Sequence, residues 1–104
     1  MNKKKQVSLQ KQGWRVGTVA KFLELTSEEA QLVEIKLALS RALRQRRARQ
    51  MTQTELAKRI ESSQPRIAKA ELGDRSVSMD LLVRALLATG ATPKEIGREI
   101  ARLG

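Results

Sequence analysis

The sequence predicts an all-α fold of about five helices, with a further helical extension on its N-terminal side. Three observations support this class. Apolar residues recur at the spacing of one helix face along most of the chain. T-x-x-E capping boxes, which mark helix starts, begin at Thr26, Thr52 and Thr92. The chain has one Trp, one Phe and no Tyr, so its core would be built from Leu, Ile, Val and Ala, as in many helical bundles.

The chain is expected to divide into three parts. Residues 1–13 carry lysines among polar residues and are interpreted as a flexible basic arm, which either touches phosphates or a partner protein or is a plain disordered tail. Residues 14–40 form a helical extension, in which a short helix over Thr18–Leu25 precedes a long one that runs into the core. The long helix covers roughly Ser27–Arg49, about 33 Å. Residues 41–104 form the compact bundle.

The residue types that are absent exclude several classes of site. The sequence has no Cys and no His, which excludes disulfides, Cys/His zinc sites and the Ser-His-Asp and Cys-His catalytic arrangements. We therefore expect no metal, no cofactor and no catalytic residue. No apolar run is long enough to span a bilayer and no signal-peptide core follows the basic start, so we expect a cytoplasmic protein without membrane contact.

The net charge indicates the kind of partner. A charge of +10 at pH 7 is large for 104 residues and favours a polyanion, most simply nucleic acid. The alternative is basic charge that only aids solubility. Charge by itself does not separate DNA from RNA or from an acidic membrane surface, so a motif has to make that distinction.

Residues 52–73, TQTELAKRIESSQPRIAKAELG, predict two short helices joined by a tight turn. Thr52 and Glu55 form the capping box of the first helix. Ser63 is the expected cap of the second, and Pro65 falls in its first turn, where no intrahelical donor is needed. Gly73 ends the second helix. Two helices this short must pack on other elements, because isolated short helices are marginal in water.

The second of these helices can present one face to a partner. Ile67 is expected to face inward, whereas Pro65 and Lys69 point away from it, with Arg66 on the flank and Gln64 at the leading end. This exposed set offers amide and cationic donors and no acidic group. It suits a helix whose N-terminal end enters a DNA major groove.

At these residues the chain resembles the helix-turn-helix of the phage-repressor (Cro/Xre) family. The framework residues that match are Gln53, Glu55, Leu56, Ala57, Ser63, Ile67, Glu71 and Gly73. The resemblance implies a lambda-repressor-like bundle and makes residues 41–104 a DNA-binding domain. The family usually has glycine at the turn where this chain has Glu61; if the left-handed conformation is kept, Glu61 bears a cost of about 1 kcal/mol.

The resemblance also implies roles for residues outside the two helices. A basic residue of the first core helix pairs with the acid matching Glu71, which assigns a partly buried ion pair to Arg46 and Glu71. The family grips the DNA backbone with the loop after the motif, where Arg75 and Ser76 supply donors. Gln53 would place its amide near a phosphate, as its family match does.

The expected mode of recognition follows from these positions. Gln64 can bond the edge of adenine, Lys69 or Arg66 can read guanine or hold phosphate, and Pro65 can contact a thymine methyl group. The full set expected to contact DNA is Gln53, Ser63, Gln64, Pro65, Arg66, Lys69, Arg75 and Ser76. One such module buries little surface, so specific binding to double-stranded DNA implies a homodimer on two half-sites about 34 Å apart.

Three functions are consistent with this picture. The first is a stand-alone transcriptional repressor. The second is an autoregulating antitoxin of a type II toxin–antitoxin pair, because the size, the single repressor-type domain and the N-terminal extension resemble HigA-like antitoxins. Either the extension, with Trp14 and Phe22, or the last helix would then hold the toxin; otherwise Trp14 and Phe22 dock on the core. The third is a small basic ribonuclease, against which the absence of His and Tyr argues.

Overall fold

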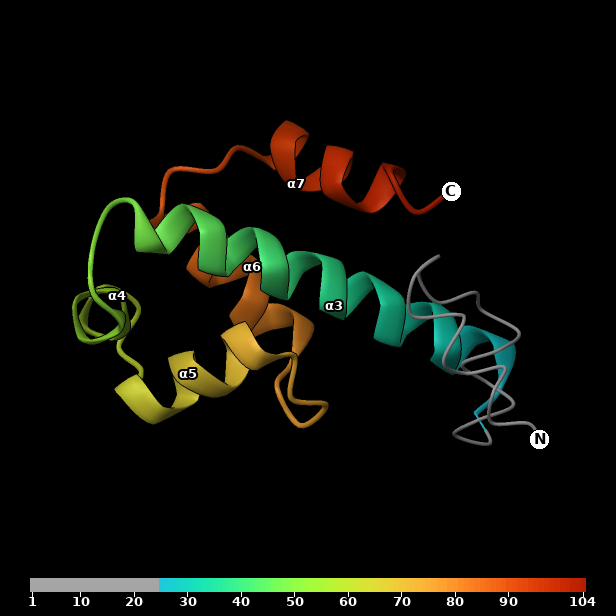
Figure 1. Cartoon of the computed structure of the whole chain (residues 1–104), viewed down its shortest axis with the longest axis horizontal. Helices are drawn as coiled ribbons and strands as arrows, with labels where there is room; N and C mark the ends of the chain where they lie inside the picture. The colour runs from blue at the N-terminus through green and yellow to red at the C-terminus, as the bar shows by residue number, and fades with distance from the viewer. Residues whose placement is uncertain (1–24) are drawn as a thin grey trace. The chain divides into compact units, whose positions relative to one another are not determined.

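The computed structural model describes residues 25–104, and the chain divides into two compact units after Glu34. All regular structure in the described range is helical (Figure 1). The helices are α3 (Ser27–Ala48), α4 (Gln53–Arg59), α5 (Gln64–Leu72), α6 (Met79–Ala88) and α7 (Pro93–Ala101). The predicted all-α class is confirmed. The expected arm, Trp14, Phe22 and all of the expected helix over residues 18–25 except Leu25 lie outside the described residues.

Local capping fixes where the helices begin. At Thr52 the hydroxyl oxygen accepts from the amide of Glu55 at 3.0 Å, and the Glu55 carboxylate accepts from the amide of Thr52 at 2.8 Å. The same reciprocal bonds join Thr26 to Glu29 and Thr92 to Glu95. Such a cap stabilises a helix by about 1 kcal/mol. All three capping boxes predicted from the sequence are therefore confirmed.

Three helices end in the same way, with a left-handed residue after the last turn. After α4 this residue is Glu61 (φ 54°), after α5 Gly73 (φ 79°) and after α6 Gly90 (φ 95°). In each case the next amide bonds back five residues; Ser62 N to Ala57 O is 2.8 Å. This is the Schellman arrangement, which favours glycine because a side chain is strained at positive φ.

The core of residues 35–104 lies between α3 and the four shorter helices. Its fully buried large side chains are Leu39, Leu43, Leu56, Ile67, Leu82 and Leu86. Ile96 of α7 joins this cluster and Ile100 packs against it, so the apolar face of α7 covers the core. Leu87 is 45% exposed, because its neighbour Leu86 already faces inward and one residue turns a helix by about 100°.

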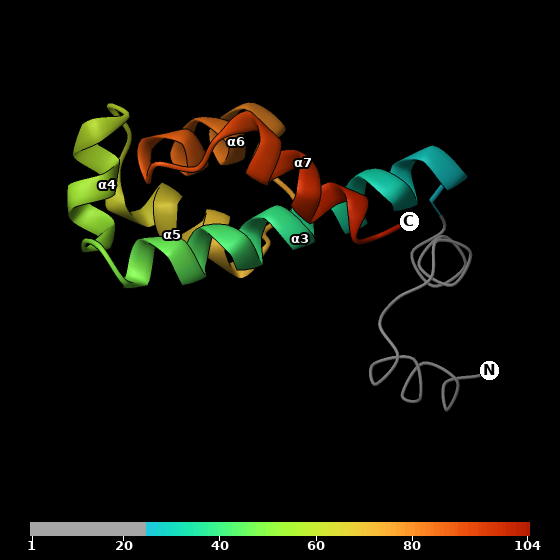
Figure 2. The ribbon, with the colours of Figure 1, turned by 90° about the horizontal axis from the view of Figure 1, so that it is seen from above.

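The arrangement of the helices separates two surfaces of this unit. Figures 1 and 2 show α5 and α7 on opposite sides of the layer that α6 and the C-terminal half of α3 form. The outer side of α5 is therefore not covered by α7. None of the described helices combines the length and hydropathy that a membrane crossing requires.

Candidate nucleic-acid interface

The helices α4 and α5 meet through a turn of four residues, Ile60 to Ser63. Glu61 keeps the left-handed conformation at this turn, as expected for the family position that usually carries glycine. Ser63 then caps α5: its hydroxyl oxygen accepts from the amide of Arg66 at 3.4 Å. The turn fixes the N-terminal end of α5 at the surface of the protein.

The outer face of α5 is open to solvent. Ile67 and Ala70 are fully buried beneath it. Its exposed side chains include Gln64, Pro65, Arg66 and Lys69, all expected from the sequence. Leu72, at 77% exposure, also belongs to this face and was not among the residues expected there. The one acidic residue of α5, Glu71, is buried, so the exposed face keeps its cationic and amide character.

The ion pair that holds α5 to α3 differs from the predicted one by a single residue. Arg47, not Arg46, contacts Glu71: Nε donates to Oε2 at 2.6 Å and Nη2 donates to Oε1 at 2.8 Å. The side chains of Arg47 and Glu71 are only 16% and 3% exposed. All three guanidinium nitrogens of Arg47 are engaged, because Nε and Nη2 bond Glu71 and Nη1 donates to the carbonyl oxygen of Met51.

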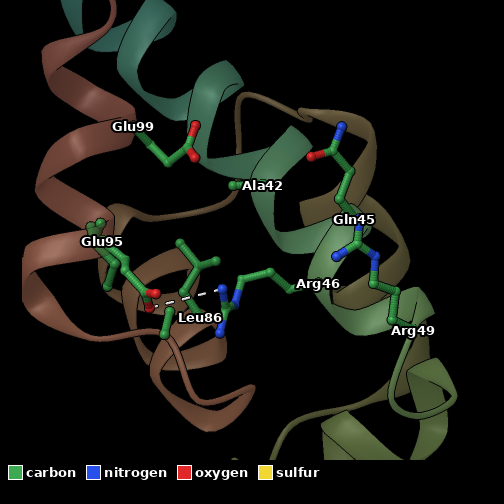
Figure 3. A pocket seen from close by; sticks show the side chains of 9 residues that line it. Ala42, Gln45, Arg46, Arg49, Leu86, Glu95 and Glu99 are labelled. Atoms are coloured by element: carbon green, nitrogen blue, oxygen red, sulfur yellow. Dashed lines mark ion pairs between the residues drawn. The ribbon is translucent and has the colours of Figure 1, made fainter.

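Arg46 lies on the other side of α3. Its Nε donates to the Thr89 hydroxyl at 3.2 Å, and its Nη1 is 3.9 Å from Oε1 of Glu95 on α7. Figure 3 shows this side chain directed toward α7, at a pocket of about 170 Å³ that α3, α6 and α7 line. The predicted pair named Arg46 in place of Arg47. Each residue of a helix is rotated by about 100° from the one before it, so adjacent arginines meet different neighbouring helices.

The Arg47–Glu71 pair shifts the pKa values of both groups. Burial raises the pKa of Glu71, but hydrogen bonds from Arg47 and Gln53 and the charges of Arg47 and Arg44 outweigh it, and the pKa ends below its ordinary value. The hydrogen bond with Glu71 raises the pKa of Arg47 against the opposing effect of its burial. Both groups are therefore ionised at neutral pH.

A chain of side-chain amides leads from this ion pair to the outer face of α5. Gln53, the first residue of α4, donates from Nε2 to Oε1 of Glu71 at 3.0 Å. The Oε1 atom of Gln53 accepts from Nε2 of Gln64 at 2.6 Å. Gln53 was expected beside a phosphate; its role as a link between Glu71 and Gln64 could not be found from the sequence, because the three residues lie on different turns of the chain.

The loop after α5 is held from two directions. The carboxylate oxygen Oδ1 of Asp74 accepts from the amide of Ser76 at 2.8 Å and from its hydroxyl at 2.6 Å. These bonds also lower the pKa of Asp74. The carbonyl oxygen of Arg75 accepts from Nζ of Lys36 at 3.0 Å. The Arg75 side chain is exposed, whereas both donors of Ser76 are used within the loop, so Arg75 is the better placed of the two to bind a phosphate.

The part of the chain that the structure describes contains no group of three His, Cys, Asp or Glu residues that could hold a metal ion. What it offers at α5 is an exposed helix face with hydrogen-bond donors. Such a surface can enter a groove and bond to base edges and phosphates.

Comparisons with known proteins give one match. A family model described as helix-turn-helix matches residues 41–96, which is more than half of the chain and contains α4 through the start of α7. Searches of the curated proteins and of the solved structures returned no match.

Proposed function

This chain belongs to the Cro/C1-type helix-turn-helix family of DNA-binding transcriptional regulators, and we propose that it is a sequence-specific repressor that inserts α5 into the DNA major groove. One observation carries the proposal. The outer face of α5 is exposed and carries Gln64, Arg66 and Lys69, while its single acid, Glu71, is buried and paired. A face with donors and no exposed carboxylate is complementary to base edges and phosphates.

The proposed contacts to bases come from the first two turns of α5. Gln64 bonds the N6 and N7 edge of adenine, and Lys69 or Arg66 bonds guanine or a phosphate. Pro65 makes apolar contact with a thymine methyl group. Gln64, Pro65 and Arg66 lie in the first turn of α5, at the end that carries the partial positive charge of the helix, which further favours an approach to the anionic duplex.

The proposed contacts to the DNA backbone surround this face. The second N–H of Gln53 Nε2 remains available for a phosphate beyond its bond to Glu71. The exposed Ser63 hydroxyl and the Arg75 guanidinium supply further donors. Ser76 contributes only if a phosphate displaces the carboxylate of Asp74 from its hydroxyl.

The regulator binds as a homodimer on two half-sites about 34 Å apart, because one module buries too little surface for specific affinity. Sedimentation of the full chain with duplexes that carry one or two half-sites measures this directly. Two chains on the two-site duplex, with much tighter binding than to one site, are the expected result. One chain per duplex with equal affinity contradicts the dimer.

We further propose that the repressor is the autoregulating antitoxin of a type II pair. The support is the segment before residue 41, which includes Trp14 and Phe22 and lies outside the family match. Purification of the chain from its native host, with identification of the bound protein and DNA, tests the idea. A toxin in the complex supports it, and DNA without a protein partner favours the stand-alone regulator.

Selection of duplexes from a random pool tests the DNA-binding proposal. The full chain should enrich a short motif, repeated with two-fold symmetry. Purified chain should not cleave RNA; cleavage that an Arg substitution abolishes would support the ribonuclease alternative. A pool that shows no enriched sequence at moderate salt contradicts sequence-specific binding.

A further inference from the structure

We propose that Glu71 acts as a specificity residue: through Gln53 it fixes the orientation of the Gln64 amide and so makes α5 select adenine over guanine. The inference rests on the proposed function and goes beyond it, because Glu71 is buried and faces away from the duplex. The geometry that supports it is the chain of bonds from Arg47 to Gln64.

The Glu71 carboxylate sets the donor-to-acceptor direction of these hydrogen bonds. An ionised carboxylate can only accept hydrogen bonds, and Arg47 holds Glu71 in its ionised form. The Gln53 side chain must therefore turn its NH₂ group toward Glu71, at 3.0 Å. Its oxygen then points the other way, toward α5.

The oxygen of Gln53 in turn orients Gln64. An oxygen can only accept, so Gln64 must present its own NH₂ group there, at 2.6 Å. One N–H of Gln64 is consumed by this bond. What remains for a base is one N–H and the carbonyl oxygen, that is, one donor and one acceptor.

The one donor and one acceptor left on Gln64 match adenine and do not match guanine. In the major groove adenine offers the N7 acceptor and the N6 donor, whereas guanine offers two acceptors, N7 and O6. Guanine would need both N–H groups of Gln64, but one is committed to Gln53. If the chain of bonds ran in the opposite direction, Gln64 would accept from Gln53, keep both N–H groups free and accommodate guanine. The carboxylate at position 71 prevents this reversal.

The test measures a ratio of affinities, not an affinity. Binding of the full chain is measured to its selected duplex with A·T or G·C at the base pair where Gln64→Ala removes the preference. The unmodified chain should favour adenine by about tenfold or more. Gln53→Met keeps the length of the side chain but removes both the NH₂ donor and the oxygen acceptor of its amide, so the ratio should fall at least threefold. Gln45→Met, an exposed glutamine on α3 next to the pocket on the α7 side, is the matched control and should leave the ratio unchanged.

A second variant tests the donor-to-acceptor direction of the hydrogen bonds from Gln64 through Gln53 to Glu71. Glu71→Gln retains an oxygen for Arg47 but can offer NH₂ or oxygen to Gln53, so guanine affinity should rise relative to adenine. Thermal unfolding checks that this variant is folded; if it is not, Gln53→Met decides alone. Equal weakening of both duplexes by Gln53→Met, which is the result expected from loss of a phosphate contact only, overturns the inference. Gln64-dependent binding without any adenine preference in the unmodified chain also overturns it, while DNA binding stands. A pool with no enriched duplex removes both proposals.

Discussion

Arg47 and Glu71 form a two-bonded ion pair between α3 and α5, with donor–acceptor distances of 2.6 and 2.8 Å. Arg47 also donates from Nη1 to the carbonyl oxygen of Met51 at 3.2 Å, so its guanidinium joins α3, the loop before α4 and α5. Such buried pairs fix geometry more than they add net stability, because desolvation offsets the attraction of the charges. The orientation of α5 on the bundle depends on this contact.

Breaking the pair from one side should be strongly destabilising. Arg47→Leu leaves the Glu71 carboxylate buried without its cation and should lower the free energy of unfolding by about 3–5 kcal/mol. The double variant Arg47→Leu with Glu71→Leu should be more stable than Arg47→Leu, because no charge remains buried. Urea unfolding followed by circular dichroism measures both. Arg46→Leu is the control: its partner Glu95 is half-exposed, and a loss of about 1 kcal/mol is expected.

The stability contributed by Glu71 should disappear in acid. Its pKa is lowered in the folded protein, so its contribution is present above the unfolded-state pKa and is lost as the pH falls through the folded-state value. The difference in unfolding free energy between the unmodified chain and Glu71→Gln should therefore be constant near neutrality and shrink below about pH 4.5. Asp74 and Glu95 also have lowered pKa values, but they are present in both proteins and cancel in the difference. A difference that grows toward low pH contradicts this assignment.

Replacing the left-handed residue between α4 and α5 should stabilise the protein. Glu61→Gly relieves the strain at φ 54° and should raise the free energy of unfolding by up to about 1 kcal/mol. Glu61→Ala removes the acidic charge from the C-terminal end of α4 but keeps the strain, so it separates the two effects. The opposite change, Gly73→Ala, should be destabilising, because a Cβ atom there would lie 2.6 Å from Cδ2 of Leu37. Thermal melts of the three variants give the comparison.

Substitutions on the outer face of α5 should weaken binding in a sequence-dependent way. Gln64→Ala and Lys69→Ala should each reduce affinity for the selected duplex by about 1–3 kcal/mol. Arg98→Ala, on the exposed side of α7, removes the same charge as Lys69→Ala from the opposite side of the unit and should have little effect. Fluorescence anisotropy at fixed salt measures these affinities. Unchanged affinity of both α5 variants for the selected duplex would contradict the insertion of α5 into the major groove.

A substitution in the loop after α5 should act on all sequences alike. Arg75 has an exposed side chain, and its carbonyl oxygen accepts from Lys36, so its backbone is held in the loop that follows α5. Arg75→Ala should weaken binding to specific and random duplexes by the same factor and reduce the slope of log K against log salt by about 1. A loss confined to the selected duplex would instead make Arg75 a base contact.

Local signals predicted most of the fold. The capping boxes at Thr52 and Thr92, and the glycine that ends α5, are confirmed because each depends on residues within one turn of the chain. The limits of α3 agree with the prediction to within one residue for the same reason. The outward set on α5 could be selected because Ile67 defines the buried face of a short helix.

Contacts between helices could not be predicted in the same way. The apolar stripe of α3 places both Arg46 and Arg47 at the edge of the core, and only the positions of α5 and α7 decide which arginine meets which acid. The link from Glu71 through Gln53 to Gln64 joins α4 and α5 through side-chain ends, whose directions no local pattern specifies. Leu72, which is 77% exposed, was not among the residues selected on α5, because the expected set was chosen for its amide and cationic donors.

The hydrogen-bonded row from α3 through α4 to the tip of α5 bears on attempts at redesign. A chimaera that receives only the solvent-facing residues of α5 would acquire Gln64 without the side chains that orient its amide. Transfer of Arg47, Gln53 and Glu71 together with those residues should therefore be the smallest graft that carries this chain's preference into another repressor.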